Sequence, residues 1–268
     1  MNLRGILRRA LQVAGLVPQP PDYLGQQVAR SWAKESRNLT WFGLRDGMSV
    51  LDLGCGPGHF TERLTQLLPQ ATITALDSES RMLDAARRRL GTRASIVHAP
   101  AHDTGLPDAS FDFIVARLLF QHLPQPEPVL RECRRLLKPG GRLAIIDVDD
   151  DLFGLTAPRV PGLKRLLGRY GRAQTQRGGN RRIGRSLVRL LRDAGFTETQ
   201  LECVAVHSDE SGLDAVFPQL DPMPLQSLLA QGQLTRAEHD ALRAAREAFL
   251  AHDPFALALL FMACGRRA

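Results

Sequence analysis

Three closely spaced glycines, Gly54, Gly56 and Gly58, are the residues whose type and spacing suggest chemistry most directly. They follow a run of strand length at residues 50–53, in which Asp52 is the one polar residue, and lead into a helical pattern that begins at Phe60. Glycine has no Cβ atom, so a ligand can approach the backbone of such a turn closely. In α/β folds a turn of this kind lies at the carboxyl end of a strand, where ligands bind. The competing interpretation is a tight strand-to-helix connection without a ligand.

Asp77 strengthens the ligand interpretation. It ends the next strand-like run, residues 72–76, and lies 19 residues after Gly58. An acidic side chain near this spacing can accept hydrogen bonds from both ribose hydroxyls of a bound nucleoside. The alternative role is an N-cap for a helix predicted over residues 79–90, since Asp is a favoured cap, and Ser78 could fill that role as well. We therefore predict a nucleoside site at the glycine turn and Asp77.

The elements that must hold this site alternate along the chain from Met48 onward. Short apolar runs, each followed by a helical pattern, are typical of a parallel sheet that is covered on both faces. The sequence therefore predicts a doubly wound α/β fold. The predicted strands are 49–53, 72–76, 95–99, 111–116, 142–148, 199–206 and 255–263, and the predicted helices include 60–68, 79–90, 128–137 and 183–194. Two further helices are predicted before Gly43, separated by Pro18, Pro20 and Pro21.

Composition agrees with a folded enzyme-sized chain. The 268 residues are 44% hydrophobic and 24% charged, which excludes a disordered or fibrous protein as a description of the whole. The longest apolar run, residues 255–264, is about half of the roughly 20 residues that a membrane-spanning helix needs. The four cysteines form no C-x-x-C pair, so we predict no metal site, no disulfide framework and a reducing cytoplasmic location.

Positive charge is concentrated in one segment. Residues 152–192 contain eleven basic residues and no acidic one, whereas the other 24 basic and 28 acidic residues give the rest of the chain a net charge of −4. Guanidinium groups bind carboxylate and phosphate well. We predict either an acidic acceptor or acidic partner surface held by this segment, or a solvated cationic face. The arginines in question are Arg169, Arg172, Arg177, Arg181 and Arg182.

Several ordered motifs follow one another between residues 48 and 147. They are Asp52–Gly58, Asp77, Leu106-Pro107, Ser110-Phe111-Asp112, Arg117–Leu123 and Leu137–Gly141. Together they resemble the class I S-adenosylmethionine-dependent methyltransferases, and in particular the small-molecule branch that includes the ubiquinone and menaquinone biosynthesis enzymes. The resemblance implies a mostly parallel, Rossmann-like seven-stranded sheet with N-terminal helices and a helical lid.

The same resemblance implies a domain division and a cofactor. Residues 1–47 would form an N-terminal helical cap, and residues 48–268 the methyltransferase domain with lid insertions near 152–179 and 207–253. The cofactor would be S-adenosyl-L-methionine, with S-adenosyl-L-homocysteine as product. The implied cofactor-binding residues are Asp52, Gly54, Cys55, Gly56, Gly58, Asp77, Ser78, Met82, His102, Asp103, Ala116, Arg117 and His122.

Within that set, the resemblance implies distinct roles. The glycine turn would lie under the methionine part of the cofactor, Asp77 would hold the ribose, and Met82 would pack on the adenine or in the core. The family usually has an acid four residues before Leu-Pro that contacts the adenine amine; His102 occupies that position here, so we assign the contact to the neighbouring Asp103.

Two residues near the end of the fourth predicted strand have open roles. Arg117 would pair with the cofactor carboxylate or a substrate acid, or else form a salt bridge with a surface carboxylate. His122 is the candidate general base, because an unperturbed imidazole titrates near neutrality, although packing is the alternative. No catalytic residue is singled out, because aligning a nucleophile with an activated methyl group can supply much of the rate. Asp147, Asp149 and His207 are further candidate bases if the acceptor is a hydroxyl, but Asp147, Asp149, Asp150 and Asp151 are predicted instead to be a solvated strand end.

The function predicted from these residues is methyl transfer to a small molecule, with an acidic, secondary-metabolite or quinone-like acceptor. One alternative is an RNA methyltransferase, which the cationic segment suggests. Nucleic-acid methyltransferases that act on amino groups have an acid or Asn followed by Pro-Pro and an aromatic residue at this position, whereas this chain has Ala116-Arg117-Leu118-Leu119. The other is a non-catalytic scaffold that binds the cofactor. We expect no nucleic-acid partner and no transmembrane segment, and the basic N-terminal helix could act as a lid or contact a membrane surface. The oligomeric state is left open.

Overall fold

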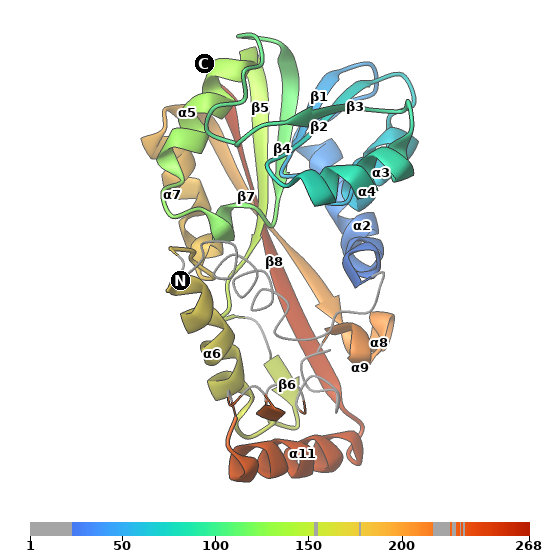
Figure 1. Ribbon diagram of the computed structural model, residues 1–268, viewed down its shortest axis with the longest axis vertical. Helices are drawn as coiled ribbons and strands as arrows, with labels where there is room; N and C mark the ends of the chain where they lie inside the picture. Colours follow the sequence, from blue (N-terminus) through green and yellow to red (C-terminus); the bar gives the residue numbers. More distant parts are fainter. Residues whose placement is uncertain are drawn as a thin grey trace. The chain divides into compact units, whose positions relative to one another are not determined.

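An eight-stranded sheet organises the part of the chain that the computed structural model describes, which is residues 23–152, 155–176, 178–216, 226, 229–230, 232 and 234–268. The strand order is β3-β2-β1-β4-β5-β8-β6, and β7 pairs with β8 (Figure 1). The strands are β1 (Ser49–Leu53), β2 (Thr72–Asp77), β3 (Ser95–His98), β4 (Phe111–Arg117), β5 (Leu137–Val148), β6 (Leu155–Ala157), β7 (Phe196–His207) and β8 (Phe255–Arg267).

The first five strands form the parallel half of the sheet. β1 pairs in parallel with β2 and β4, β2 with β3, and β4 with β5. The central strands are mostly apolar, and Val50, Leu51 and Leu53 of β1 are fully buried. Burial on both faces is what a parallel sheet covered by helices requires. The predicted doubly wound, mostly parallel α/β fold is therefore confirmed.

The other half of the sheet is antiparallel. It brings the number of described strands in the whole sheet to eight, one more than the seven predicted. β8 runs antiparallel to β5 and to β6. The additional strand, β6, has only three residues, of which Leu155 and Ala157 are exposed. So short and exposed a segment gives no apolar run in the sequence, and only its pairing with residues 255–257 makes it a strand.

β5 also begins earlier than predicted, at Leu137 instead of Arg142. The register between β4 and β5 shifts between Phe111 and Phe113, which accommodates the Lys-Pro-Gly-Gly segment within the strand. A Cβ atom on Gly141 would lie 2.9 Å from the carbonyl oxygen of Lys138, so this position has room only for glycine.

Helices connect the strands and supply apolar faces. α5, for example, buries Val129, Leu130, Cys133 and Leu136, which lie on one side at helical spacing. The helices are α2 (Tyr23–Trp41), α3 (His59–Leu67), α4 (Ser80–Leu90), η1 (Phe120–His122), α5 (Glu127–Leu136), α6 (Leu163–Thr175), η2 (Ile183–Ser186), α7 (Leu187–Asp193), α8 (Ser208–Ser211), α9 (Leu213–Val216) and α11 (Arg236–Leu250). None of the described helices is long and apolar enough to span a membrane.

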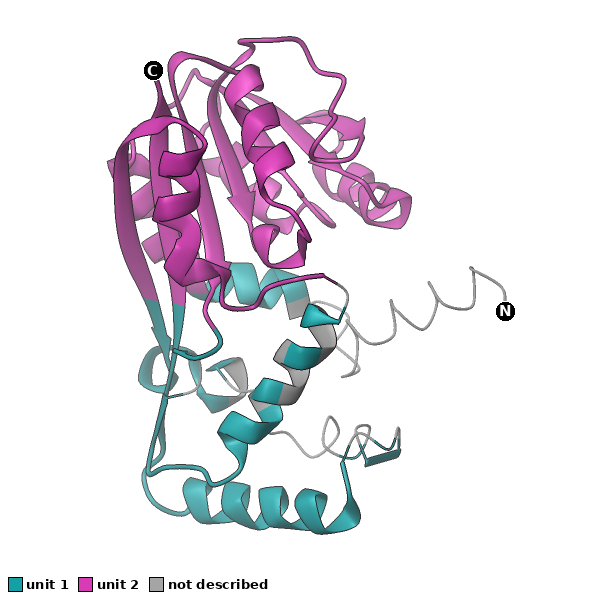
Figure 2. Ribbon diagram, turned by 90° about the vertical axis from the view of Figure 1, so that its left-hand side faces the viewer, with its two compact units in different colours: residues 1–30, 150–177, 205–259 teal, residues 31–149, 178–204, 260–268 magenta. Residues whose placement is uncertain are grey.

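The chain divides into two compact units (Figure 2). One comprises residues 31–149, 178–204 and 260–268 and contains the parallel half of the sheet. The other comprises the described parts of 1–30, 150–177 and 205–259, and so contains most of both predicted lid insertions. The predicted first helix and its suggested membrane contact lie outside the described residues.

Candidate cofactor site

The glycine turn leaves the carboxyl end of β1 in a conformation that suits glycine. Gly54, Gly56 and Gly58 all have positive φ, at 80°, 53° and 83°. The backbone N–H groups of Gly54 and Cys55 donate to the carbonyl oxygen of Leu76 on β2, at 2.8 and 2.9 Å. The turn is thereby fixed to the neighbouring strand before α3 begins.

Space around the three glycines differs. A Cβ on Gly54 would meet Leu119 at 3.1 Å, and one on Gly58 would meet Ala86 of α4 at 3.2 Å. A Cβ on Gly56 would meet nothing within 4 Å. The backbone at Gly56 is thus the part of the turn that a ligand can approach, whereas the other two glycines permit close packing of the protein itself.

Asp77 connects the turn to the start of α4. Its Oδ2 accepts a hydrogen bond from the backbone N–H of Gly56 at 2.8 Å, and its Oδ1 accepts from that of Glu79 at 2.9 Å. A carboxylate has about four acceptor positions, so these two bonds leave capacity for hydroxyl groups of a ligand. The N-cap of α4 is Glu79 and lacks a side-chain cap bond, and exposed Ser78 instead contacts His98 through its backbone oxygen.

Asp52 lies beneath the turn and is fully buried. Its Oδ2 accepts a hydrogen bond from the Thr61 hydroxyl at 2.6 Å. Burial raises the pKa of Asp52 to about 7, although the Thr61 hydroxyl and the charge of Arg117 act in the opposite direction. Because this side chain is enclosed, it supports the turn and can affect a ligand only through neighbouring groups.

Three other predicted residues lie around the turn. Cys55 packs in a buried cluster with Leu83 and Ala86, and burial raises the pKa of its thiol well above the usual range, so only its backbone can face a ligand. Met82 is half-buried on α4 and Ala116 is fully buried at the end of β4.

The loop between β3 and β4 carries the predicted adenine contact. His102 and Asp103 are both exposed, and the N–H of Asp103 donates to the carbonyl oxygen of Pro100 at 3.2 Å. The following residue, Thr104, is buried. The structure therefore leaves both candidate side chains accessible on a loop that is anchored immediately afterwards.

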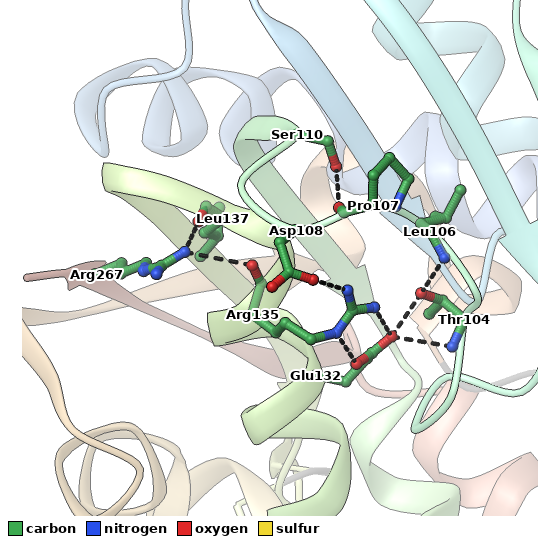
Figure 3. A network of polar contacts seen from close by, with 9 residues as sticks. All are labelled: Thr104, Leu106, Pro107, Asp108, Ser110, Glu132, Arg135, Leu137 and Arg267. Carbon is green, nitrogen blue, oxygen red and sulfur yellow. Dashed lines mark hydrogen bonds and ion pairs between the residues drawn. The ribbon is translucent and has the colours of Figure 1, made fainter.

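A polar network makes that anchor (Figure 3). The Glu132 carboxylate of α5 accepts from the Thr104 hydroxyl at 2.6 Å and from its backbone N–H at 3.0 Å. Arg135 donates to both oxygens of the same carboxylate, at 2.7 and 2.8 Å, and also to Asp108. The hydrogen bonds from Arg135 are the main reason that the pKa of Glu132 falls to about 2. One ionised side chain thus fixes the loop to α5.

Arg117, at the end of β4, forms a buried ion pair. Its Nε lies 3.1 Å from each carboxylate oxygen of Glu35 on α2, and its Nη2 donates to the Ser31 hydroxyl at 3.2 Å. The guanidinium carbon is 5.7 Å from the centroid of the Phe60 ring, within cation–π distance. Arg117 thus forms the salt bridge that was the alternative to ligand binding, but its partner is buried and not on the surface, because the Glu35 side chain is 0% exposed.

Glu35 was not among the predicted site residues. Its signal in the sequence is an acid placed four residues after Ser31 in a helix whose apolar residues include Val28 and Leu39. Both Ser31 and Glu35 are buried with those apolar residues, so a carboxylate on the buried face was detectable in principle, but its partner was not.

His122 ends the short helix η1 and is exposed. The neighbouring Gln121 is fixed on both sides, since its N–H donates to Asp147 at 3.0 Å and its Oε1 accepts from Arg181 at 2.9 Å. The position of His122 is therefore set by the backbone of η1, and its role as a general base stays a prediction.

The acidic end of β5 corrects another expectation. Asp147 and Asp149 are 0% exposed and are not a solvated strand end. Burial raises the pKa of Asp147 to about 7, against the hydrogen bonds from Val148 and Gln121. Asp149 pairs with Arg185 through two bonds of 2.5 and 2.6 Å.

The arginines of the cationic segment thus have different surroundings. Arg172 and Arg182 are exposed, whereas Arg181 is half-buried and bonded to Gln121. Arg177 and the side chain of Arg169 lie outside the described part of the structure. Among the described residues, no group of three His, Cys, Asp or Glu side chains could hold a metal ion.

Comparison with known proteins agrees with this geometry. Residues 51–145 match the family described as a methyltransferase domain. The chain is 31% identical over 146 residues to the demethylmenaquinone methyltransferase of Listeria welshimeri, covering 53% of this chain and 58% of that protein. Residues 51–145 therefore form a methyltransferase domain, and the chain is similar to known methyltransferases.

Two further proteins are similar to this chain. It is 32% identical over 207 residues to an uncharacterized 37.1 kDa protein of a Streptomyces fradiae transposon, covering 75% of this chain and 59% of that protein. Haemonchus contortus phosphoethanolamine N-methyltransferase 2, solved with phosphomonomethylethanolamine and S-adenosylhomocysteine, has the same fold, with a TM-score of 0.55, 17% identity, and coverage of 88% of this chain and 53% of that one. The chain spans a little under three fifths of the length of these two curated relatives.

Proposed function

We propose that this protein transfers a methyl group from S-adenosyl-L-methionine to a small-molecule acceptor. The observation that carries the proposal is the pairing of an accessible backbone at Gly56 with the carboxylate of Asp77, which lie 2.8 Å apart at the ends of adjacent strands. This arrangement fits a nucleoside: the turn has room beside its backbone, and the carboxylate has acceptor capacity left for ribose hydroxyls.

The proposed roles of the residues follow from their positions. The turn from Gly54 to Gly58 lies under the amino-acid end of the cofactor, Asp77 binds the ribose, and the accessible Asp103 contacts the adenine amine. Asp52 supports the turn from below. The cofactor supplies a methyl group on a sulfonium, which makes the carbon strongly electrophilic.

Direct displacement at the methyl carbon is the proposed reaction. The acceptor's nucleophilic atom forms a bond to that carbon as the bond between sulfur and carbon breaks, and any acceptor proton passes to solvent or to a base. The protein's task is to align the acceptor and exclude water, because orientation alone supplies a large share of the rate. His122 is the proposed base where the acceptor must lose a proton.

We propose an acidic or quinone-like acceptor. The similarity to a demethylmenaquinone methyltransferase supports the quinone-like class, and the exposed side chains of Arg172 and Arg182 support an acidic group. We further propose that the protein acts in the cytoplasm.

Calorimetry with S-adenosylhomocysteine and a transfer assay with methyl-labelled cofactor test the proposal together. We expect the wild-type protein to bind S-adenosylhomocysteine and the Asp77→Ala variant to bind it at least tenfold more weakly, since a hydrogen bond to a charged group contributes about 1.5–3 kcal/mol. With a metabolite extract, label should enter a small product. Equal affinity of the two proteins would refute the assigned site, and tight binding without labelled product would indicate a non-catalytic scaffold.

A further inference from the structure

We propose that Glu35 is a positioning residue for cofactor binding: it fixes Arg117 so that the guanidinium can hold the carboxylate at the amino-acid end of the cofactor. This inference rests on the proposed function. It assigns a role to α2, which precedes the residues matched by the family, and to a side chain that touches no part of the glycine turn itself.

The ion pair is enclosed and well defined. The Arg117 side chain is 7% exposed and that of Glu35 is 0% exposed. Nε of Arg117 lies midway between the two oxygens of Glu35, at 3.1 Å from each, and Ser31 accepts from Nη2. Three contacts from one helix therefore determine where the guanidinium lies.

The pair also adjoins the site. Arg117 is the last residue of β4, next to β1 in the sheet, and its guanidinium lies against Phe60, two residues after Gly58. The same Phe60 ring meets Trp32 of α2 edge to face, with centroids 5.5 Å apart. α2, β4 and the start of α3 are thus held together around one cation at the end of the strands where the glycine turn lies.

A guanidinium has donors for a second anion. It carries five N–H groups in a fixed plane, and the contacts to Glu35 and Ser31 use Nε and Nη2. Within the described residues, Nη1 makes no hydrogen bond. Arg117 and Glu35 together carry no net charge. A ligand carboxylate near Nη1 would nevertheless accept a directed hydrogen bond from a guanidinium whose position is fixed.

Burying the carboxylate of Glu35 has a cost in free energy. Taking two charges out of water costs several kcal/mol per ion, and apolar replacements of similar size are often no less stable. Stability alone is therefore a weak reason to place an ion pair here. Binding of an anionic ligand by the fixed guanidinium would explain why the ion pair is present.

The experiment compares two ligands that differ in the amino-acid end. S-adenosylhomocysteine carries the carboxylate, and 5′-methylthioadenosine lacks the whole amino-acid group while keeping the nucleoside. We expect Glu35→Gln to weaken binding of S-adenosylhomocysteine about tenfold in calorimetry, the effect of losing one hydrogen bond to a charged group, and to leave the affinity for 5′-methylthioadenosine within about twofold.

Two further variants separate positioning from folding. Arg117→Met should give the same selective loss, and Glu35→Gln added to it should cause little further change. The double variant Glu35→Met/Arg117→Met removes both charges, so it should fold as well as the wild type and still bind S-adenosylhomocysteine weakly. The exposed pair of Asp84 and Arg87, with side chains 59% and 51% exposed, provides the matched control: Asp84→Asn should change neither affinity.

Each outcome decides the matter. A loss confined to S-adenosylhomocysteine supports the proposal. Unchanged affinities in Glu35→Gln, or equal losses for both ligands, would overturn it, and the second result would leave Glu35 a purely structural role. Wild-type protein that binds neither ligand would refute the proposed function and this proposal with it, whereas wild-type binding with no effect of Glu35→Gln would refute this proposal alone.

Discussion

Replacing Gly58 with alanine should destabilise the fold much more than the same change at Gly56, two residues away. Gly58 has φ of +83°, which costs an L-residue about 1–2 kcal/mol. The new Cβ would also lie 3.2 Å from the Cα and Cβ of Ala86 and from Leu90, and such overpacking costs about 1–3 kcal/mol. Gly56 shares only the first cost, because nothing lies within 4 Å of its Cβ position.

The expected loss of unfolding free energy is therefore about 2–5 kcal/mol for Gly58→Ala and about 1–2 kcal/mol for Gly56→Ala. Urea unfolding followed by tryptophan fluorescence measures it. Both tryptophans of the chain, Trp32 and Trp41, lie on the part of α2 that belongs to the same unit as the turn, and Trp32 contacts Phe60. Equal losses for the two variants, or a larger loss for Gly56→Ala, would show that α4 does not press on the turn as described.

Three more predictions concern the same unit. Gly56→Ala should weaken S-adenosylhomocysteine binding more than Gly58→Ala does in any fraction that stays folded, since its Cβ occupies the space left for the ligand; calorimetry on both variants decides this. Glu132→Gln should lower the unfolding free energy by about 1.5–3 kcal/mol in urea titrations. The control Asp84→Asn, in an exposed pair, should change it by less than about 1 kcal/mol. Similar losses of unfolding free energy in the two variants would contradict the anchoring role of the Thr104 network. Asp52 has a pKa of about 7 in the folded protein, against 3.8 for an ordinary aspartate. The folded state therefore holds an extra proton between these pH values, and stability falls as pH rises from about 4 to 7, by at most about 1.4 kcal/mol per pH unit. Asp52→Asn keeps the acceptor for Thr61 and should make that fall shallower in unfolding measurements at pH 5 and 7.5, while the part due to Asp147, whose pKa is also about 7, remains; an unaltered slope would refute the assignment.

Much of the parallel half of the fold could be predicted from the sequence, because each element there satisfies its own local rules. β1 begins and ends at the predicted residues. Each end of helices α3, α4 and α5 lies within one residue of its predicted position. Apolar runs bounded by glycine, proline or acidic residues contain the necessary information. The short β6 and the early start of β5 depend instead on pairing with residues distant in the sequence, and no local pattern reveals them.

At the site, local sequence is enough to identify the residues whose backbone or carboxylate has one suitable position: the three glycines need positive φ, and Asp77 follows a buried strand beside them. Which side chains are enclosed and which charges meet depends on tertiary packing. Glu35 and Arg117 are separated by 82 residues, and Asp149 and Arg185 by 36, so their pairing depends on how strands and helices pack and leaves no periodic trace in the chain. Burial, which raises the pKa values of Asp52 and Asp147, is likewise a property of the packed sheet and its helices.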